Sequence, residues 1–151
     1  MRSVLDDHGD RWFVTSLVYE PPRLVLTLSQ AVRGAELPVL NGPDGPIPTP
    51  GRRRLEASSE SRAVEVTFQE VVAYQVLDEM FTRSNERETP DDPRHVIQVL
   101  NDSPFLERLP GELFAPPWNC AERRLFRVCT LGAVVDVVGR GAPQVRPSCG
   151  T

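Results

Sequence analysis

The sequence predicts an α+β fold that is mainly antiparallel β, with about six strands in hairpins and one short helix. Several short segments alternate apolar and polar residues or are rich in β-branched ones, as strands are, and the chain has 19 valines but only two isoleucines. Neighbouring strand segments are separated by turns rather than by helical crossovers, which excludes repeated βαβ units. An all-β sandwich or barrel is the alternative. A length of 151 residues fits a single domain, residues 1–151.

The first predicted element is an N-terminal hairpin. Residues Arg11–Tyr19 carry aromatic and β-branched side chains on both faces, which is typical of a strand covered on both sides. Glu20, Pro21 and Pro22 end this strand. Residues Arg23–Ser29 then place three leucines on one face at a spacing of two, so we expect a second strand that pairs with the first.

Residues 34–62 are predicted to form one long loop rich in proline, glycine and arginine. Half of residues 34–51 are glycine or proline. Proline has no backbone N–H to donate, so we expect no strand ladder in this part of the chain. Loops of this length are usually functional or disordered.

The remaining elements follow from local patterns. Residues Ala63–Gln69 alternate as a half-buried strand does, and the valines of Val71–Leu77 favour a strand over a helix. The pair Asp92–Pro93 has the N-cap and first-turn residues of a helix, so we predict the one short helix there. Arg124–Thr130 and Ala133–Gly139 form a second predicted hairpin around a tight turn.

The composition excludes several classes of function. All 17 basic residues are arginine, so Schiff-base chemistry, the P-loop and the catalytic lysines of kinases are ruled out. The absence of lysine and the scarcity of isoleucine indicate a GC-rich bacterial genome. A formal net charge of −4 argues against binding nucleic acid, which requires a basic face.

Targeting and redox signals are also lacking. No apolar run is long enough to span a membrane, and residues 1–10 contain no apolar signal segment. The three cysteines are an odd number without metal or disulfide spacing, which indicates reduced thiols. We therefore expect a cytoplasmic protein with no membrane contact and no cofactor, and with flexible termini at residues 1–10 and 141–151.

Candidate catalytic residues are few. Histidine is the usual base at neutral pH, and apart from His8 the only one is His95. Its side chain would face Cys120, with Asp78 or Glu79 orienting the ring. A surface histidine and a packed cysteine are the alternative. Asp78 and Glu79 are adjacent and point to opposite faces of a strand, so a solvated strand end explains them equally well.

The densest set of oxygen and nitrogen ligands lies at the N-terminus, in Asp6, Asp7, His8 and Asp10. Such hard ligands would suit a divalent cation. Neighbouring residues on a mobile terminus rarely build a rigid site, so we predict no metal there.

Three features are candidates for binding. Arg52, Arg53 and Arg54 would contact phosphate or an acidic partner, unless they simply form a solvated loop. Trp118 lies in a proline-rich loop, where it would anchor a partner or plug the end of the sheet. Asp136 interrupts a run of valines, and it becomes a site candidate if both faces of its strand are covered.

No spacing in the chain assembles a catalytic motif. We therefore favour a non-enzymatic module that binds another protein, for example a toxin-neutralising, immunity-like protein whose negative charge attracts a basic enzyme. One alternative is a small-ligand enzyme or binding protein with a cleft near Cys120 and His95. The other is a structural homodimer formed through the valine-rich terminal hairpin.

Overall fold

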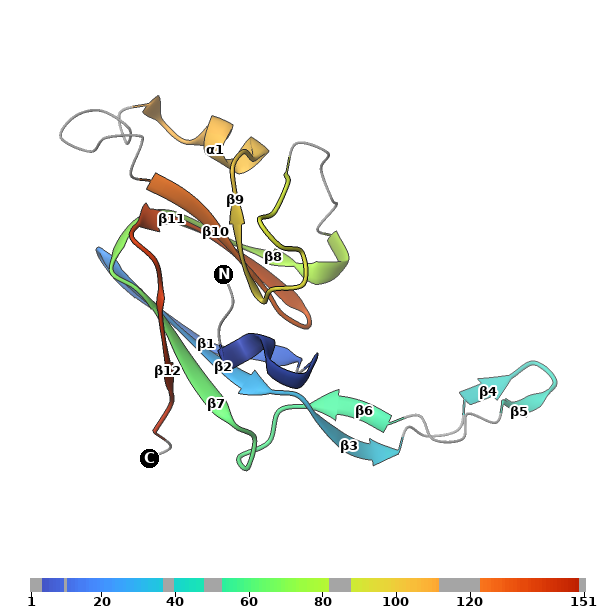
Figure 1. The fold of residues 1–151 in the computed structure, drawn as a ribbon. Coiled ribbons are helices and arrows are strands. Elements are labelled where there is room, and N and C mark those ends of the chain that lie inside the picture. The colour runs from blue at the N-terminus through green and yellow to red at the C-terminus, as the bar shows by residue number, and fades with distance from the viewer. Residues whose placement is uncertain are drawn as a thin grey trace.

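Two four-stranded antiparallel sheets dominate the computed structural model, which describes residues 4–9, 11–36, 40–47, 53–81, 88–111 and 123–149 (Figure 1). The first sheet has the order β1 (Trp12–Glu20), β2 (Arg23–Gln30), β7 (Ala63–Phe68) and β12 (Gln144–Pro147). The second has the order β8 (Glu70–Asp78), β11 (Ala133–Arg140), β10 (Arg123–Cys129) and β9 (Ile97–Leu100). The predicted antiparallel β character is confirmed. Within these residues neither sheet closes into a barrel.

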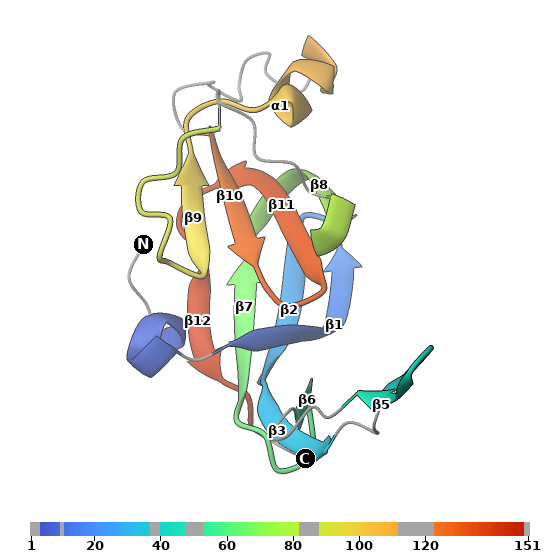
Figure 2. The same cartoon turned by 90° about the vertical axis from the view of Figure 1, so that its right-hand side faces the viewer.

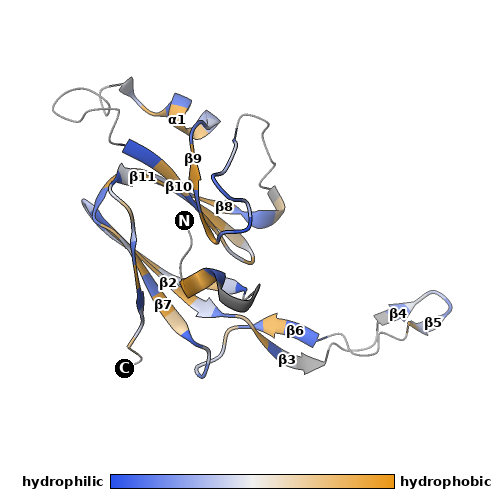
Figure 3. Cartoon of the chain, in the orientation of Figure 1, coloured by the Kyte–Doolittle hydropathy of each residue, from blue (hydrophilic) through white to orange (hydrophobic). Residues whose placement is uncertain are grey.

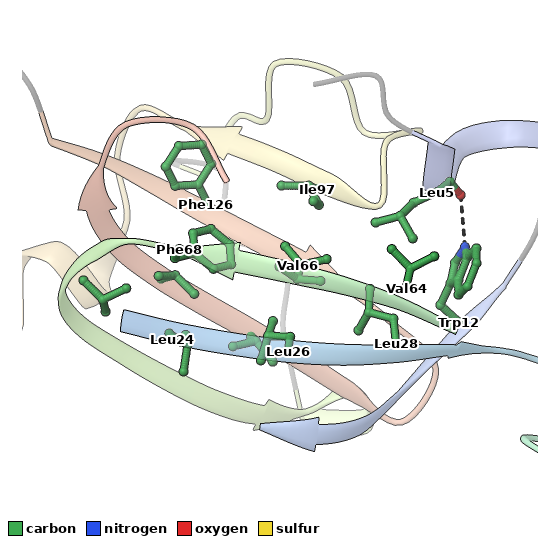
Figure 4. Close-up of a cluster of buried hydrophobic side chains, with 14 residues drawn as sticks. Leu5, Trp12, Leu24, Leu26, Leu28, Val64, Val66, Phe68, Ile97 and Phe126 are labelled. Carbon is green, nitrogen blue, oxygen red and sulfur yellow. Dashed lines mark hydrogen bonds between the residues drawn. The ribbon is translucent and has the colours of Figure 1, made fainter. Parts of the chain in front are cut away.

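One hydrophobic core lies between the two sheets. The alternating leucines of β2 point into it from the first sheet, as the sequence predicted, and Phe126 and Val128 enter it from the second (Figure 4). The rings of Phe68 and Phe126, one from each sheet, have centroids 5.7 Å apart. Figure 3 shows hydrophobic residues on the strands of both layers, and their burial is the main favourable contribution to folding.

The N-terminal segment closes one end of this core. Residues Val4–Gly9 form the short 3-10 helix η1, and the chain then crosses the end of the sandwich into β1 (Figure 2). Leu5 is 0% exposed, and its carbonyl accepts a hydrogen bond of 3.0 Å from Nε1 of the buried Trp12 (Figure 4). Residues 4–9, part of the N-terminus that was expected to be flexible, therefore form a short helix that covers this end of the core, and we call this helix the plug.

A β-bulge changes which residues of β1 face the core. The register with β2 shifts between Val14 and Ser16, so Leu17 and Tyr19 join Val14 on the core side. Val18 points outward and is 48% exposed. The prediction that β1 is covered on both faces is therefore wrong, while the predicted hairpin with β2 is confirmed.

The predicted loop at residues 34–62 contains two ribbons of two strands each. The first pairs β3 (Val32–Glu36) with β6 (Arg53–Glu56), and the second pairs β4 (Leu40–Gly42) with β5 (Gly45–Ile47). We call the described residues of 32–56 the arm; it extends away from the sandwich (Figure 1). The expectation of no ladder was wrong because each strand of such a ribbon keeps a free edge, where a proline such as Pro46 is tolerated.

The predicted helix at Asp92–Pro93 is also wrong. The β-branched residues that follow form β9, which pairs with β10. The helix starts later as α1 (Pro104–Arg108), where Ser103 caps it by accepting a hydrogen bond from the Phe105 N–H. The short 3-10 helix η2 (Glu79–Phe81) follows β8.

The second predicted hairpin is confirmed by β10 and β11, which lie in the centre of their sheet between β9 and β8. Gly132 in its turn has a φ of +78°, a left-handed conformation that favours glycine. Gly139 lets β8 approach closely, because a Cβ there would lie 2.8 Å from the Glu70 carbonyl oxygen. The C-terminal residues 144–147, expected in a flexible tail, pair with β7 as β12.

Candidate functional site

A row of polar side chains crosses the outer face of the second sheet. Gln98, Arg127, Asp136 and Gln75 stand opposite one another on β9, β10, β11 and β8. They alternate along each strand with residues of the core between the sheets, so they point to the other face. A smaller apolar cluster that includes Phe105 of α1 covers part of that face.

Asp136 is the most buried charge in this row. Its side chain is 0% exposed, and both of its oxygens accept bonds from Arg127, Nε to Oδ1 at 2.7 Å and Nη2 to Oδ2 at 3.0 Å. Oδ2 also accepts a bond of 2.9 Å from Nε2 of Gln75. Such a bidentate pair is the geometry that makes an arginine–carboxylate interaction strong. Both faces of β11 are therefore covered, and Asp136 has the partners that the sequence required.

Glu88 joins the same network from the segment that precedes β9. Its Oε2 accepts a bond of 2.6 Å from Nη1 of Arg127, and its Oε1 accepts a bond of 2.8 Å from Oγ of Ser103. Ser103 in turn is the N-cap of α1. The guanidinium group of Arg127 therefore connects β10 to β11 through Asp136 and to the segment before β9 through Glu88, which in turn bonds to Ser103 at the start of α1.

The chemistry of this network is that of a structural clamp. Hydrogen bonding to Asp136, and next to Glu88, raises the pKa of Arg127 above its usual range, so the guanidinium stays charged at any accessible pH. Every carboxylate oxygen of Asp136 and Glu88 has a donor. A carboxylate that is fully bonded in this way is poorly placed to accept a proton from a substrate.

His95 lies in an open groove of about 420 Å³ on the β9 and β10 side. Glu79, Gln98, Cys129 and Thr130 also line this groove. Cys120, the predicted partner of His95, lies outside the described residues, and Cys129 lines the same groove as His95. Burial raises the pKa of the Cys129 thiol, which disfavours the thiolate that a nucleophile needs.

Asp92 is held by its neighbours rather than by a ligand. Oδ1 accepts bonds from the backbone N–H and from Nε of Arg94, and Nη2 of Arg94 lies 2.8 Å from Oδ2. These bonds to Arg94 place the pKa of Asp92 well below its usual range. Nε2 of His95 is 3.6 Å from the same Oδ2. The charge of Asp92 is therefore largely paired with Arg94, and the His95 ring lies beside this pair.

The paired carboxylates at the end of β8 bond to backbone groups. Oδ1 of Asp78 accepts the Met80 N–H at 2.8 Å, and Oε2 of Glu79 accepts the Gly132 N–H at 2.8 Å. Both residues are exposed. They hold the turn into η2 and the turn between β10 and β11, which agrees with the solvated strand end considered above.

The candidate metal ligands are only partly described. Asp6 bonds to the Val96 N–H at 2.7 Å, so one of its oxygens holds the plug against the segment before β9. Asp7 and His8 belong to η1, but their side chains, and all of Asp10, lie outside the described residues. Among the residues that are described, no cluster of three or more histidine, cysteine or acidic side chains could hold a metal.

The predicted binding residues are only partly described. Arg53 and Arg54 are exposed on β6 of the arm, whereas Arg52 lies outside the described residues. Trp118 and Cys120 also lie outside them.

Sequence reasoning did not name Arg127, although a signal for it existed. A hairpin that turns at Leu131–Gly132 places Arg127 directly opposite Asp136, as the structure does. Glu88 had no such signal, because its contact with β10 depends on the path of an irregular segment.

Comparison with known protein families, curated proteins and solved structures finds no significant match to this chain. None of the helices in the described ranges is long and apolar enough to cross a membrane.

Proposed function

We propose that this protein is a non-enzymatic, cytoplasmic module that binds another protein through its arm. The observation that carries the proposal is the exposure of the arm: every residue of β5 and β6 is exposed, including Ile47 at 48% and Leu55 at 41%. A two-stranded ribbon alone is only marginally stable in water. Contact with a partner would stabilise the arm and cover its apolar side chains.

The bonding of the polar side chains supports a binding role over a catalytic one. The carboxylate of Asp136 forms an ion pair with Arg127, and that of Asp92 forms one with Arg94. Burial favours the protonated thiol of Cys129. General base and nucleophilic catalysis need a group that is both reactive and accessible.

A toxin-neutralising role is one form of the proposal. The formal net charge of −4 would attract a basic enzyme over a distance, and the arm would then supply a local contact.

The test is to shorten the arm without disturbing the sandwich. Val32 and Glu56 are paired at the base of β3 and β6, so an Asn–Gly turn can replace residues 33–55 and remove both ribbons of the arm. A partner captured from the native lysate is purified, and its affinity is measured for the intact and the shortened chain. We expect a loss of at least about tenfold, which corresponds to about 1.4 kcal/mol. Equal affinity with an unchanged circular dichroism spectrum would contradict the proposal.

A second candidate is a small polar ligand in the groove that contains His95, Gln98 and Thr130, because these three side chains carry donors and acceptors there. The test is a titration of metabolite mixtures followed by backbone NMR shifts. Shifts confined to this groove, and lost in His95→Gln, would support the candidate. A library that leaves these signals unmoved would exclude it for the ligands tested.

A further inference from the structure

We propose that the partner of the arm is a second copy of this chain, which receives the arm along its β8 edge in a reciprocal, two-fold exchange. This inference rests on the binding role of the arm proposed above. It starts from β8, a strand of nine residues that pairs, among the described strands, only with β11. No described strand pairs with its other edge beyond Val71, whose N–H is bonded to the Pro22 carbonyl, and an unpaired edge offers backbone groups to another strand.

The open edge of β8 carries apolar side chains without a complete cover. Val76 stands opposite Val135 of β11, which is 0% exposed, yet Val76 itself is 52% exposed. Met80, just beyond the strand, is 89% exposed. Tyr74 finds a partner in Tyr19 of β1, with ring centroids 5.0 Å apart, so the sandwich is closed beside Tyr74 but left open beside Val76.

The charges along this edge disfavour pairing of β8 with itself. Glu70, Asp78 and Glu79 are all exposed, and β8 and η2 contain no basic residue; the nearest cation is Arg140 of β11, 3.8 Å from Glu70. Two copies of β8 paired antiparallel would bring the acidic end of one strand, Asp78 and Glu79, close to Glu70 of the other. Like charges at such positions are unfavourable, so the edge is suited to a basic strand.

The arm supplies such a strand. β6 begins with Arg53 and Arg54 and continues with Leu55, and all three are exposed. β6 pairs on one side with β3, and no other strand in the described ranges pairs with it. Placed along β8, the two arginines would meet Asp78 and Glu79, and Leu55 would cover Val76. The arm and the β8 edge are therefore complementary in both charge and apolar character.

The positions of the two surfaces allow a closed dimer. In Figures 1 and 2, which differ by a quarter turn, the arm and the η2 end of β8 both lie on the right-hand side of the molecule. Because the arm and the edge that receives it lie on one side of the chain, a two-fold axis between two copies can form both contacts at once. That geometry gives a dimer rather than an open chain of molecules.

The experiment measures mass in solution by light scattering during gel filtration. We expect the wild-type chain to dimerise at micromolar concentration, and the dimer to weaken as salt is raised. The double variants R53E/R54E and D78R/E79R should each weaken the dimer about tenfold or more. Mixed in equal amounts, these two variants should form a heterodimer, because each arm then meets an edge of opposite charge. Arg146→Glu on the distant strand β12 is the matched control and should leave the dimer unchanged.

A second variant guards against misfolding, since Asp78 and Glu79 also accept backbone N–H groups. Val76→Arg adds a positive charge to the same edge without removing those bonds, and it should also prevent dimerisation. A wild-type monomer, or variants that fail to recombine while folded, would overturn the inference. If the chain is a monomer that still binds a different protein through the arm, this inference fails and the proposed function stands. If removal of the arm changes neither the mass in solution nor the affinity for the captured partner, the inference and the proposed function both fail.

Discussion

Replacing Arg127 with methionine tests whether the buried charge network is the clamp described above. Methionine keeps much of the length of the side chain but removes the guanidinium. Asp136 would lose two of its three donors and keep only Gln75, and Glu88 would keep only the hydroxyl of Ser103. Both carboxylates would remain where they are, at 0% and 9% side-chain exposure.

The expected loss is large because these carboxylates cannot easily regain water. Removing one partner of a buried ion pair destabilises a protein by about 3–5 kcal/mol, since the remaining charge is left uncompensated. The total stability of a domain is about 5–15 kcal/mol, so Arg127→Met should remove about a fifth of it or more. Asp136→Leu added to Arg127→Met should restore part of the loss, and Glu88→Gln should restore more, because each change removes a stranded charge.

Urea denaturation followed by circular dichroism measures these differences. With Asp136→Leu made alone as well, the two single variants and their double variant form a cycle that measures the coupling between Arg127 and Asp136. A loss below about 1 kcal/mol, or a triple variant no more stable than Arg127→Met, would refute the clamp.

Three further predictions concern other parts of the fold. Cys129 should react with iodoacetamide far more slowly than the exposed Cys149, and mass spectrometry of the two peptides measures this; equal labelling would contradict the burial of Cys129. Burial also raises the pKa of the Cys129 thiol above 9.0. The contribution of this thiol to stability is therefore present at neutral pH and is lost as pH rises past that value. Leu5→Ala should lower stability by about 2–5 kcal/mol in urea denaturation and expose Trp12 to quenching by acrylamide, whereas an unchanged midpoint would mean that η1 is no plug. Gly132→Ala should cost about 1–2 kcal/mol, because alanine is strained at a φ of +78°, and a neutral result would place the turn in another conformation.

The hairpins were predictable because their signals are local. Alternating leucines in β2 and β-branched runs in β10 and β11 determine which face is buried, and Gly132 marks the turn between the last two. The bulge in β1 was not predictable, since the sequence around Thr15 does not reveal which residue stands out of register. The bulge therefore places Leu17 and Tyr19 on the face that packs against the core and Val18 on the exposed face.

The helix was misplaced because two segments share the same start signal. Asp92–Pro93 and Ser103–Pro104 both combine a capping residue with a proline. Only the second begins a helix, and the segment after Asp92 is drawn into the sheet by its backbone pairing with β10. Local propensity could not decide between them, because the long-range pairing was decisive.

A homodimer through the valine-rich terminal hairpin, one of the alternatives that the sequence left open, stays a prediction, and the structure shows how much of that hairpin is covered within one chain. The valines at 134, 135, 137 and 138 are 0–5% exposed within one chain, in a hairpin flanked on both sides by other strands. Such a hairpin has neither a free edge nor an exposed apolar face. Six large hydrophobic residues are exposed in the described part of the chain, and four of them lie on the arm or at the end of β8, namely Ile47, Leu55, Val76 and Met80; the other two are Val4 and Val18. Interface surfaces are defined by what the fold leaves uncovered, and that depends on the whole sheet order rather than on the apolar content of any one segment.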